Sequence, residues 1–251
     1  TQITIPEGVT SIGDWAFANC PSLTSVVVDE HNTNYISVDG ILFNKDKTTI
    51  IQYPIGKADT EYVVPAEVIT IDAGAFSGCM NLTSVIFSDS VTGIGTSAFS
   101  NCGNLLKLEL PESVTDIGDS AFTGCHCLES VKIPGGVTKI GVSTFEFCDS
   151  LVSVEIPEGV TSIGESTFSY CVSLTSITIP ESVTSIDYRA FYWCEGITSI
   201  ELPEEIESIG IKNFFFFINT PQMNFFPCLK YSSIKRLNKR DFVNYERIQI
   251  Y

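Results

Sequence analysis

One pattern recurs along most of this chain at a fixed interval of 23 residues. Phenylalanine returns at every step, and cysteine follows it three residues later, as at Phe168 and Cys171. The in-phase phenylalanines are Phe76, Phe99, Phe122, Phe145, Phe168 and Phe191, and the in-phase cysteines are Cys79, Cys102, Cys125, Cys148, Cys171 and Cys194. A period of roughly 20–50 residues is typical of a solenoid, in which each repeat forms one coil.

Each repeat carries the pattern of two short extended segments and a turn. Leu174, Ile177 and Ile179 alternate with exposed positions, which predicts a short strand that ends at the following proline. Val183 and Ile186 predict a second short extended segment. The stretch from phenylalanine to cysteine is too short for a full helix, so we expect one helical or 3₁₀ turn there.

A single repeat cannot be stable alone. It offers about seven large apolar side chains, worth roughly 10–20 kcal/mol when they are buried. Ordering its backbone costs about 1–2 kcal/mol for each residue. Stacked neighbours must therefore close each other's core and complete each other's strand ladders, as they do in solenoids.

The repeat is similar to that of a known family. Leu-x-x-Val-x-Ile-Pro followed by Val-x-x-Ile-Gly-x-x-Ala-Phe-x-x-Cys resembles the BspA-like class of leucine-rich repeats, and the resemblance covers residues 1–217. It implies a right-handed coil with a parallel β-sheet on one face and short turns or 3₁₀ segments on the other. It also implies a cell-surface or secreted protein that binds matrix or cell-surface proteins.

An insert interrupts the pattern near the N-terminus. Phe17 precedes Phe76 by 59 residues, which is 23 plus 36, so we expect an extra module over about 29–64. Within it, β-rich segments at 37–43 and 49–53 flank a polar turn and predict a β-hairpin. This module also resembles one found in the same family. It is a contact loop or a spacer, and we favour the spacer.

The two ends of the chain depart from the repeat as well. The first repeat lacks its opening leucine, so we expect further repeats or a cap upstream of Thr1. After Phe214 the pattern stops, and residues 218–251 are expected to form a separate basic tail. That tail is a C-terminal cap, or it is not an evolved continuation of the repeats.

Charge is distributed unevenly along the chain. Residues 1–210 hold seven cationic and 28 acidic side chains, a net charge of −21, whereas residues 211–251 hold seven and two, a net charge of +5. The acidic body argues against nucleic acid and anionic lipid as partners. No apolar run approaches the roughly 20 residues that cross a bilayer, so we expect no membrane insertion. The oligomeric state cannot be inferred.

No catalytic or cofactor motif stands out. The chain has only two histidines, His31 and His126, and its Gly-x-Ser sequences lack the second glycine of a nucleophile elbow. Cys125, His126 and Cys127 crowd three possible zinc ligands but lack a second pair, and residues 29–39 lack the spacing of an EF-hand. We therefore expect no enzyme, no metal and no cofactor.

The periodic cysteine has four possible roles: metal ligand, disulfide, reactive thiol or core side chain. One cysteine in each coil is too few for a metal site. Neighbouring coils are close enough for disulfides, but parallel side chains point in poor directions to form them. We therefore predict free, buried thiols at the six in-phase positions.

Outward positions of the predicted sheet form columns that a protein ligand can contact. The ligand-binding candidates are Glu109, Lys132, Glu155 and Glu201, where the column varies in charge. The simpler interpretation is that outward residues, threonines especially, favour strands and solubility. An adhesion module is the function that the resemblance favours, and an intracellular scaffold is the alternative. The Asn81-Leu82-Thr83 sequon matters only in a secreted eukaryotic protein.

Overall fold

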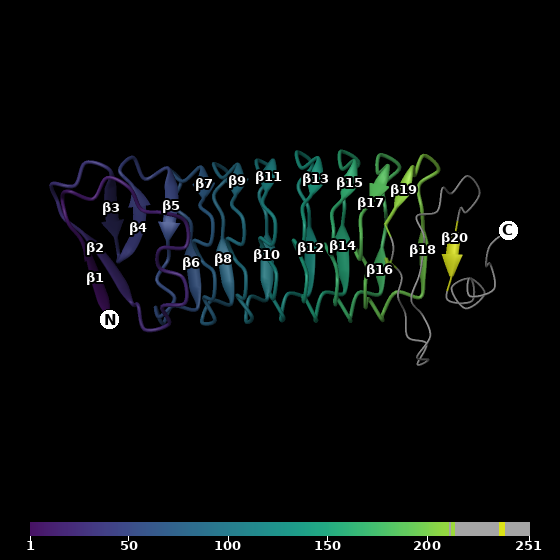
Figure 1. Ribbon diagram of the computed structural model, residues 1–251, viewed down its shortest axis with the longest axis horizontal. Coiled ribbons are helices and arrows are strands. Elements are labelled where there is room, and N and C mark those ends of the chain that lie inside the picture. The colour runs from purple at the N-terminus through teal and green to yellow at the C-terminus, as the bar shows by residue number, and fades with distance from the viewer. Residues whose placement is uncertain (211, 214–235, 239–251) are drawn as a thin grey trace.

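The computed structural model shows a long rod of stacked coils and describes residues 1–210, 212–213 and 236–238 (Figure 1). Each regular coil contributes two short strands, and equivalent strands of successive coils lie side by side along the rod. No helix occurs in this described part of the chain. The parallel-strand solenoid predicted from the sequence is confirmed, and it has about nine turns.

One strand from each coil joins a six-stranded parallel sheet, which we call the first ladder. Its strands are β6 (Glu61–Val63), β8 (Ser84–Ile86), β10 (Lys107–Glu109), β12 (Ser130–Lys132), β14 (Ser153–Glu155) and β16 (Ser176–Ile177). Neighbours pair at an offset of 23 residues, as Leu108 does with Val131. Val131 is buried while Ser130 and Lys132 are exposed, because successive side chains of a strand point to opposite faces.

The other strand of each coil is only two residues long and belongs to what we call the second ladder. This ladder comprises β7 (Thr70–Ile71), β9 (Gly93–Ile94) and β11 (Asp116–Ile117), followed in a separate sheet by β13 (Lys139–Ile140), β15 (Ser162–Ile163), β17 (Ser185–Ile186) and β19 (Ser208–Ile209). A glycine follows five of these seven strands, and Asp72 and Asp187 follow β7 and β17. The glycine permits close approach of the coils: a Cβ atom on Gly118 would lie 2.5 Å from the Thr96 nitrogen.

Tight turns, rather than a helical segment, form the side of the coil that contains the phenylalanine. The Phe76 N–H donates to the Ala98 carbonyl of the next coil (2.8 Å), whereas the Cys79 N–H donates to the Phe76 carbonyl three residues back (3.1 Å). Gly74 and Gly78 have φ angles of 67° and 77°. Residues in this left-handed region prevent a continuous helix. The expected helical or 3₁₀ turn is therefore replaced by successive tight turns that bond to the neighbouring coil.

A continuous stack of aromatic rings fills the core. Successive ring centroids lie 4.8–5.7 Å apart along Tyr53, Phe76, Phe99, Phe122, Phe145, Phe168 and Phe191. The six phenylalanines are completely buried. Such near-parallel contacts add about 0.5–1.5 kcal/mol per pair to the effect of burial itself, so each coil depends on both neighbours.

The N-terminal part contains β1 (Gln2–Ile5), β2 (Ser25–Val28), β3 (Tyr35–Val38), β4 (Ile41–Asn44) and β5 (Thr49–Gln52). Strands β1 and β2 pair in parallel, while β3, β4 and β5 pair antiparallel and extend the second ladder next to β7. The predicted hairpin corresponds to β4 and β5. Its first predicted segment is itself two strands, because the chain reverses at Asp39 and Gly40, whose φ angles are 51° and 79°.

The 23-residue register is already restored inside the segment that the sequence marks as an insert. Tyr53 stacks on Phe76, which lies 23 residues later, with a centroid distance of 5.1 Å. Strand β6 pairs with β8 at the same offset. The extra length is therefore concentrated in β3 and β4, and the rest of the segment forms part of a regular coil.

The parallel pairing of the first ladder ends at β16, near the C-terminal end of the rod. Strand β18 (Ser199–Glu201) lies outside the six-stranded sheet and pairs antiparallel with β20 (Arg236–Asn238). On the turn side, the Asn213 side chain accepts a hydrogen bond from the Phe191 N–H (3.3 Å) and donates to the Asp187 carbonyl (2.6 Å). The remaining predictions for the tail, over 214–235 and 239–251, lie outside the described residues.

Candidate functional site

The in-phase cysteines are buried hydrogen-bond donors inside the core. The thiol of Cys171 donates to the Phe145 carbonyl (3.1 Å), and that of Cys194 to the Phe168 carbonyl (3.0 Å), each 26 residues earlier. All six are free and at most 1% exposed. Burial raises the pKa of each thiol above its ordinary value, to about 12 at Cys102. A protonated, buried thiol is a poor nucleophile and metal ligand, so this column supports the fold.

Metal-ligand clusters are also missing elsewhere in the described part of the chain. No group of three or more His, Cys, Asp or Glu side chains there could hold a metal ion. His126 pairs with Asp149 at 2.9 Å in an exposed position, and Cys127 is half-buried beside it. No helix in that part is long and apolar enough to cross a bilayer.

The four ligand-binding candidates are exposed, and each is the last residue of its strand, on β10, β12, β14 and β18. Lys132 lies next to Glu155 in register and forms an ion pair with Glu112 at 2.6 Å, with both partners 65% exposed. The hydrogen bond between them lowers the pKa of Glu112 and raises that of Lys132. The one cation of the column is therefore matched by a carboxylate, and the surface around it is acidic.

Two threonines that directly precede first-ladder strands, Thr83 before β8 and Thr175 before β16, have a structural role that the sequence did not reveal. The Thr83 hydroxyl donates to the Thr60 carbonyl (3.0 Å), and the Thr175 hydroxyl to the Val152 carbonyl (3.4 Å), each in the preceding coil. On the second ladder, Thr115 and Thr184, which directly precede β11 and β17, make similar but longer contacts, at 3.5 Å. These side chains supplement the strand ladder, so the charged positions beside them are the better candidates for recognition.

A groove of about 520 Å³ lies over β14, β16 and β18 on the same face. Its apolar lining, which we call the floor, comprises Val154, Ile177, Ile179 and Leu202, and its acidic lining, which we call the rim, comprises Glu155, Glu181 and Glu201. Five serines and threonines complete the lining. No Lys, Arg or His is among the described residues that line it. This groove includes two of the four sequence-predicted candidates, whereas Glu109 and Lys132 lie outside it.

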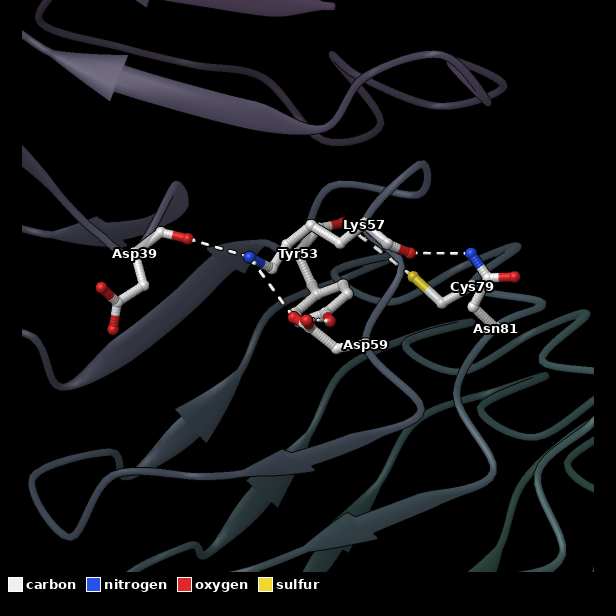
Figure 2. Close-up of polar contacts among 6 residues, drawn as sticks. All are labelled: Asp39, Tyr53, Lys57, Asp59, Cys79 and Asn81. Atoms are coloured by element: carbon white, nitrogen blue, oxygen red, sulfur yellow. Dashed lines mark hydrogen bonds and ion pairs between the residues drawn. The ribbon is translucent and has the colours of Figure 1, made fainter.

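The junction between the hairpin and the first regular coils is held by a polar network (Figure 2). Lys57 Nζ lies 3.3 Å from an Asp59 carboxylate oxygen and donates to the Asp39 carbonyl (3.1 Å). The Tyr53 hydroxyl donates to Asp59 (2.9 Å), and the Asn81 side-chain amide donates to the Lys57 carbonyl (2.7 Å). Because each group is satisfied inside the network, its role is to attach the hairpin to the rod.

An aromatic strip lies on the turn side of the C-terminal coils, and the sequence interpretation missed it. Phe147, Tyr170 and Trp193 stack with centroid distances of 4.8 and 5.7 Å, and their φ angles of 59–63° are strained for bulky residues. Earlier coils place Gly78 or Gly124 at the same position, also at positive φ. The sequence feature that indicates this strip is an aromatic residue directly before the periodic cysteine in three successive repeats.

Comparison of the sequence with protein-family models identifies the family, because one model matches nearly the whole chain. A family model described as the BspA type leucine-rich repeat region matches in six copies, over residues 1–61, 56–171 and 138–249. The chain belongs to the BspA-type leucine-rich repeat family. The repeat resemblance noted from the sequence is thereby confirmed. No curated protein matches the sequence closely enough to count as a relative.

This BspA-type chain is similar to solved structures of leucine-rich repeat proteins from bacteria. A leucine-rich repeat protein from Eubacterium ventriosum is 27% identical, with a TM-score of 0.78 over 89% of this chain and 61% of its own. A leucine-rich cell-surface protein from Faecalibacterium prausnitzii is 38% identical, with a TM-score of 0.66 over 70% of this chain and 47% of its own. This chain therefore spans less than two thirds of either structure.

A third neighbour is the pneumococcal vaccine antigen PcpA, which is 25% identical. It has a TM-score of 0.52 over 74% of this chain and 50% of its own. For this BspA-type chain, these likenesses support a repeat module. They assign no ligand to Glu109, Lys132, Glu155 or Glu201.

Proposed function

We propose that this chain is a non-catalytic protein-binding module of a cell-surface or secreted protein, and that it binds through the first-ladder face. The observation that carries the proposal is the row of exposed side chains at the ends of β10, β12 and β14, at the strand spacing of about 4.8 Å. An extended surface of this kind lets one protein ligand contact several coils together, as solenoids commonly do.

The charge of this face limits the kind of partner. Carboxylates outnumber cations on it, and Lys132 is already paired with Glu112. The partner is a matrix or cell-surface protein that presents a neutral or basic surface, because complementary charge favours encounter and register. The surface location is supported by the cell-surface protein and the vaccine antigen among the structural neighbours.

The state of the cysteines favours a second candidate, an intracellular scaffold. All eight described cysteines are free, and thiols persist most readily in reducing compartments. Labelling of intact cells with a membrane-impermeant reagent separates the two: an adhesion module is labelled on intact cells, whereas a scaffold is labelled only after lysis.

Binding of the fluorescently labelled chain to a panel of purified extracellular-matrix proteins tests the proposal. Charge reversal at Glu109→Lys and Glu155→Lys is expected to weaken binding at least tenfold. The matched control reverses the exposed Glu165 and Glu195, which lie outside the first ladder. Binding that is unchanged in the first variant and lost in the control would remove the first-ladder face from consideration.

A further inference from the structure

The groove over β14, β16 and β18 marks an irregularity in the first ladder. Strand β14 extends to Glu155, but its neighbour β16 stops at Ile177, one residue short of the equivalent position. The next strand, β18, is not part of the six-stranded sheet and pairs with β20 (Figure 1). The groove of about 520 Å³ lies where the regular ladder ends.

The lining of the groove combines apolar, hydroxyl and acidic residues. Val154, Ile179 and Leu202 are 5–6% exposed and form part of its floor. Glu155 and Glu201 are exposed on its rim. An extended peptide alternates its side chains between two sides, so apolar and cationic residues in alternation can meet the floor and the carboxylates together.

The chain itself provides an example of such a segment beside the groove. Strand β20 pairs antiparallel with β18, and this register places Arg236 opposite Glu201 and Leu237 opposite Ile200. A basic and an apolar residue thus follow one another in a strand that pairs with β18. The net charges of the two parts of the chain are also opposite in sign, −21 for residues 1–210 and +5 for residues 211–251.

We propose that this groove binds an extended basic segment of a protein partner, with lysine or arginine side chains at the carboxylates and apolar side chains on the floor. The inference rests on the proposed protein-binding function and specifies its partner. Glu155, Glu181 and Glu201 provide the charge selectivity. Because the pairs are exposed, binding weakens as salt increases.

The test measures binding of a fluorescein-labelled peptide by anisotropy. The probe has the sequence of residues 230–240, and a matched peptide replaces its five Lys and Arg residues by Gln. Two forms of the full chain are used: the natural chain and a neutral-tail chain with the same five positions changed to Gln. The neutral tail removes competition from the chain's own basic residues.

We expect the neutral-tail chain to bind the basic peptide at least tenfold more tightly than the neutral peptide. Adding Glu155→Gln, Glu181→Gln and Glu201→Gln to it should weaken that binding at least tenfold. The control variant, Glu7→Gln, Glu67→Gln and Glu165→Gln, removes the same charge outside the groove and should change it less than twofold.

Failure of the neutral-tail chain to prefer the basic peptide would overturn the inference, and so would equal losses in the groove and control variants. The proposed function is tested separately by the matrix-protein panel. Panel binding that depends on Glu109 and persists in the groove variant would retain the function while rejecting the groove as its site.

Discussion

The sulfur of Cys171 lies 3.1 Å from the carbonyl oxygen of Phe145, in the preceding coil. That carbonyl also accepts the Cys148 N–H at 3.3 Å, so one oxygen serves both its own turn and the next coil. The contact recurs with the same offset at Cys102, Cys125 and Cys194. A small thiol that fills a buried space and donates weakly explains why the cysteine is periodic.

The first prediction concerns alkaline pH. Burial raises the pKa of the column thiols above their ordinary value of 9.0, so the folded chain holds these protons longer than the unfolded chain. Their stabilisation is complete below pH 9 and is lost as the pH rises towards the folded values, which is about 12 for Cys102. Each thiol contributes a slope of up to about 1.4 kcal/mol per pH unit.

Urea unfolding between pH 9 and 10 measures this slope below the ordinary pKa of Tyr53 and Tyr62, 10.0, which burial also raises. The Cys171→Ser variant keeps a donor that does not titrate. We expect the unfolding free energy of Cys171→Ser to fall less steeply with pH than that of the natural chain. The difference in slope corresponds to about one proton released on unfolding. An unchanged slope would contradict a buried, protonated thiol at this position.

The second prediction compares two neighbouring thiols. Cys125 is completely buried, whereas Cys127 is half-buried only two residues away. Iodoacetamide should modify Cys127 and the exposed Cys20 in the native chain, and reach Cys125 only after denaturation. Peptide mapping by mass spectrometry reads each site separately. Equal native rates at Cys125 and Cys127 would show that the coils open readily.

The third prediction concerns the attachment of the hairpin to the first coil. The buried Asn32 side chain donates to the Pro6 and Val9 carbonyls (2.8 and 3.0 Å) and accepts the Asn34 and Tyr35 N–H groups (2.8 Å each). Asn32→Ala leaves these groups without that partner and should cost about 2–4 kcal/mol.

Hydrogen exchange in the first 40 residues should increase with Asn32→Ala more than in the later coils, because solenoid coils depend mainly on their neighbours. The control is Asn34→Ala at an exposed position, with an expected effect below about 0.5 kcal/mol. Similar exchange in the two variants would mean that Asn32 does not hold the junction together.

The fourth prediction uses a pair of glycines. Gly74 has a φ of 67°, and a Cβ atom there would lie 2.7 Å from two carbon atoms of the Trp15 ring. Gly8 has no neighbour within 4 Å of the equivalent point. Thermal unfolding should show a loss of about 1–2 kcal/mol or more for Gly74→Ala and little change for Gly8→Ala.

Combining Gly74→Ala with Trp15→Ala separates the two causes, because it removes the ring contact and leaves the backbone strain. Gly74→Ala should therefore cost less stability when it is added to Trp15→Ala than when it is added to the natural chain. Full additivity of the two single changes would show that the Trp15 contact has no part in the effect.

The sequence predicted the repeating part of the fold well because its pattern directly encodes burial. The spacing of Phe145 and Phe168 indicates stacking of coils, and the alternation around Val131 indicates a strand. It did not reveal that Tyr53 takes the phenylalanine position, since both the residue type and the 36-residue spacing from Phe17 differ there. The Asp39-Gly40 pair, a strong hairpin signal, was overlooked inside a longer β-rich run.

The candidate site was less predictable, because it depends on how neighbouring coils meet. Glu155 and Glu201 could be placed on the outward face from the repeat alone. That they border one groove follows from the end of β16 at Ile177 and the pairing of β18 with β20. Neither event has a signature within a single repeat. The positive φ angles beneath the aromatic strip are equally invisible in the sequence.

The hydrogen bonds that join the regular coils reach only one coil away, at offsets of 20–26 residues, as between Phe76 and Ala98, Gly118 and Ile94, and Cys171 and Phe145. Duplicating or deleting one whole repeat in the regular part would therefore give every such bond an equivalent partner. The length of the rod can change in steps of about 4.8 Å without a new core, so a gene for this fold can adjust how far the module reaches while preserving its surface.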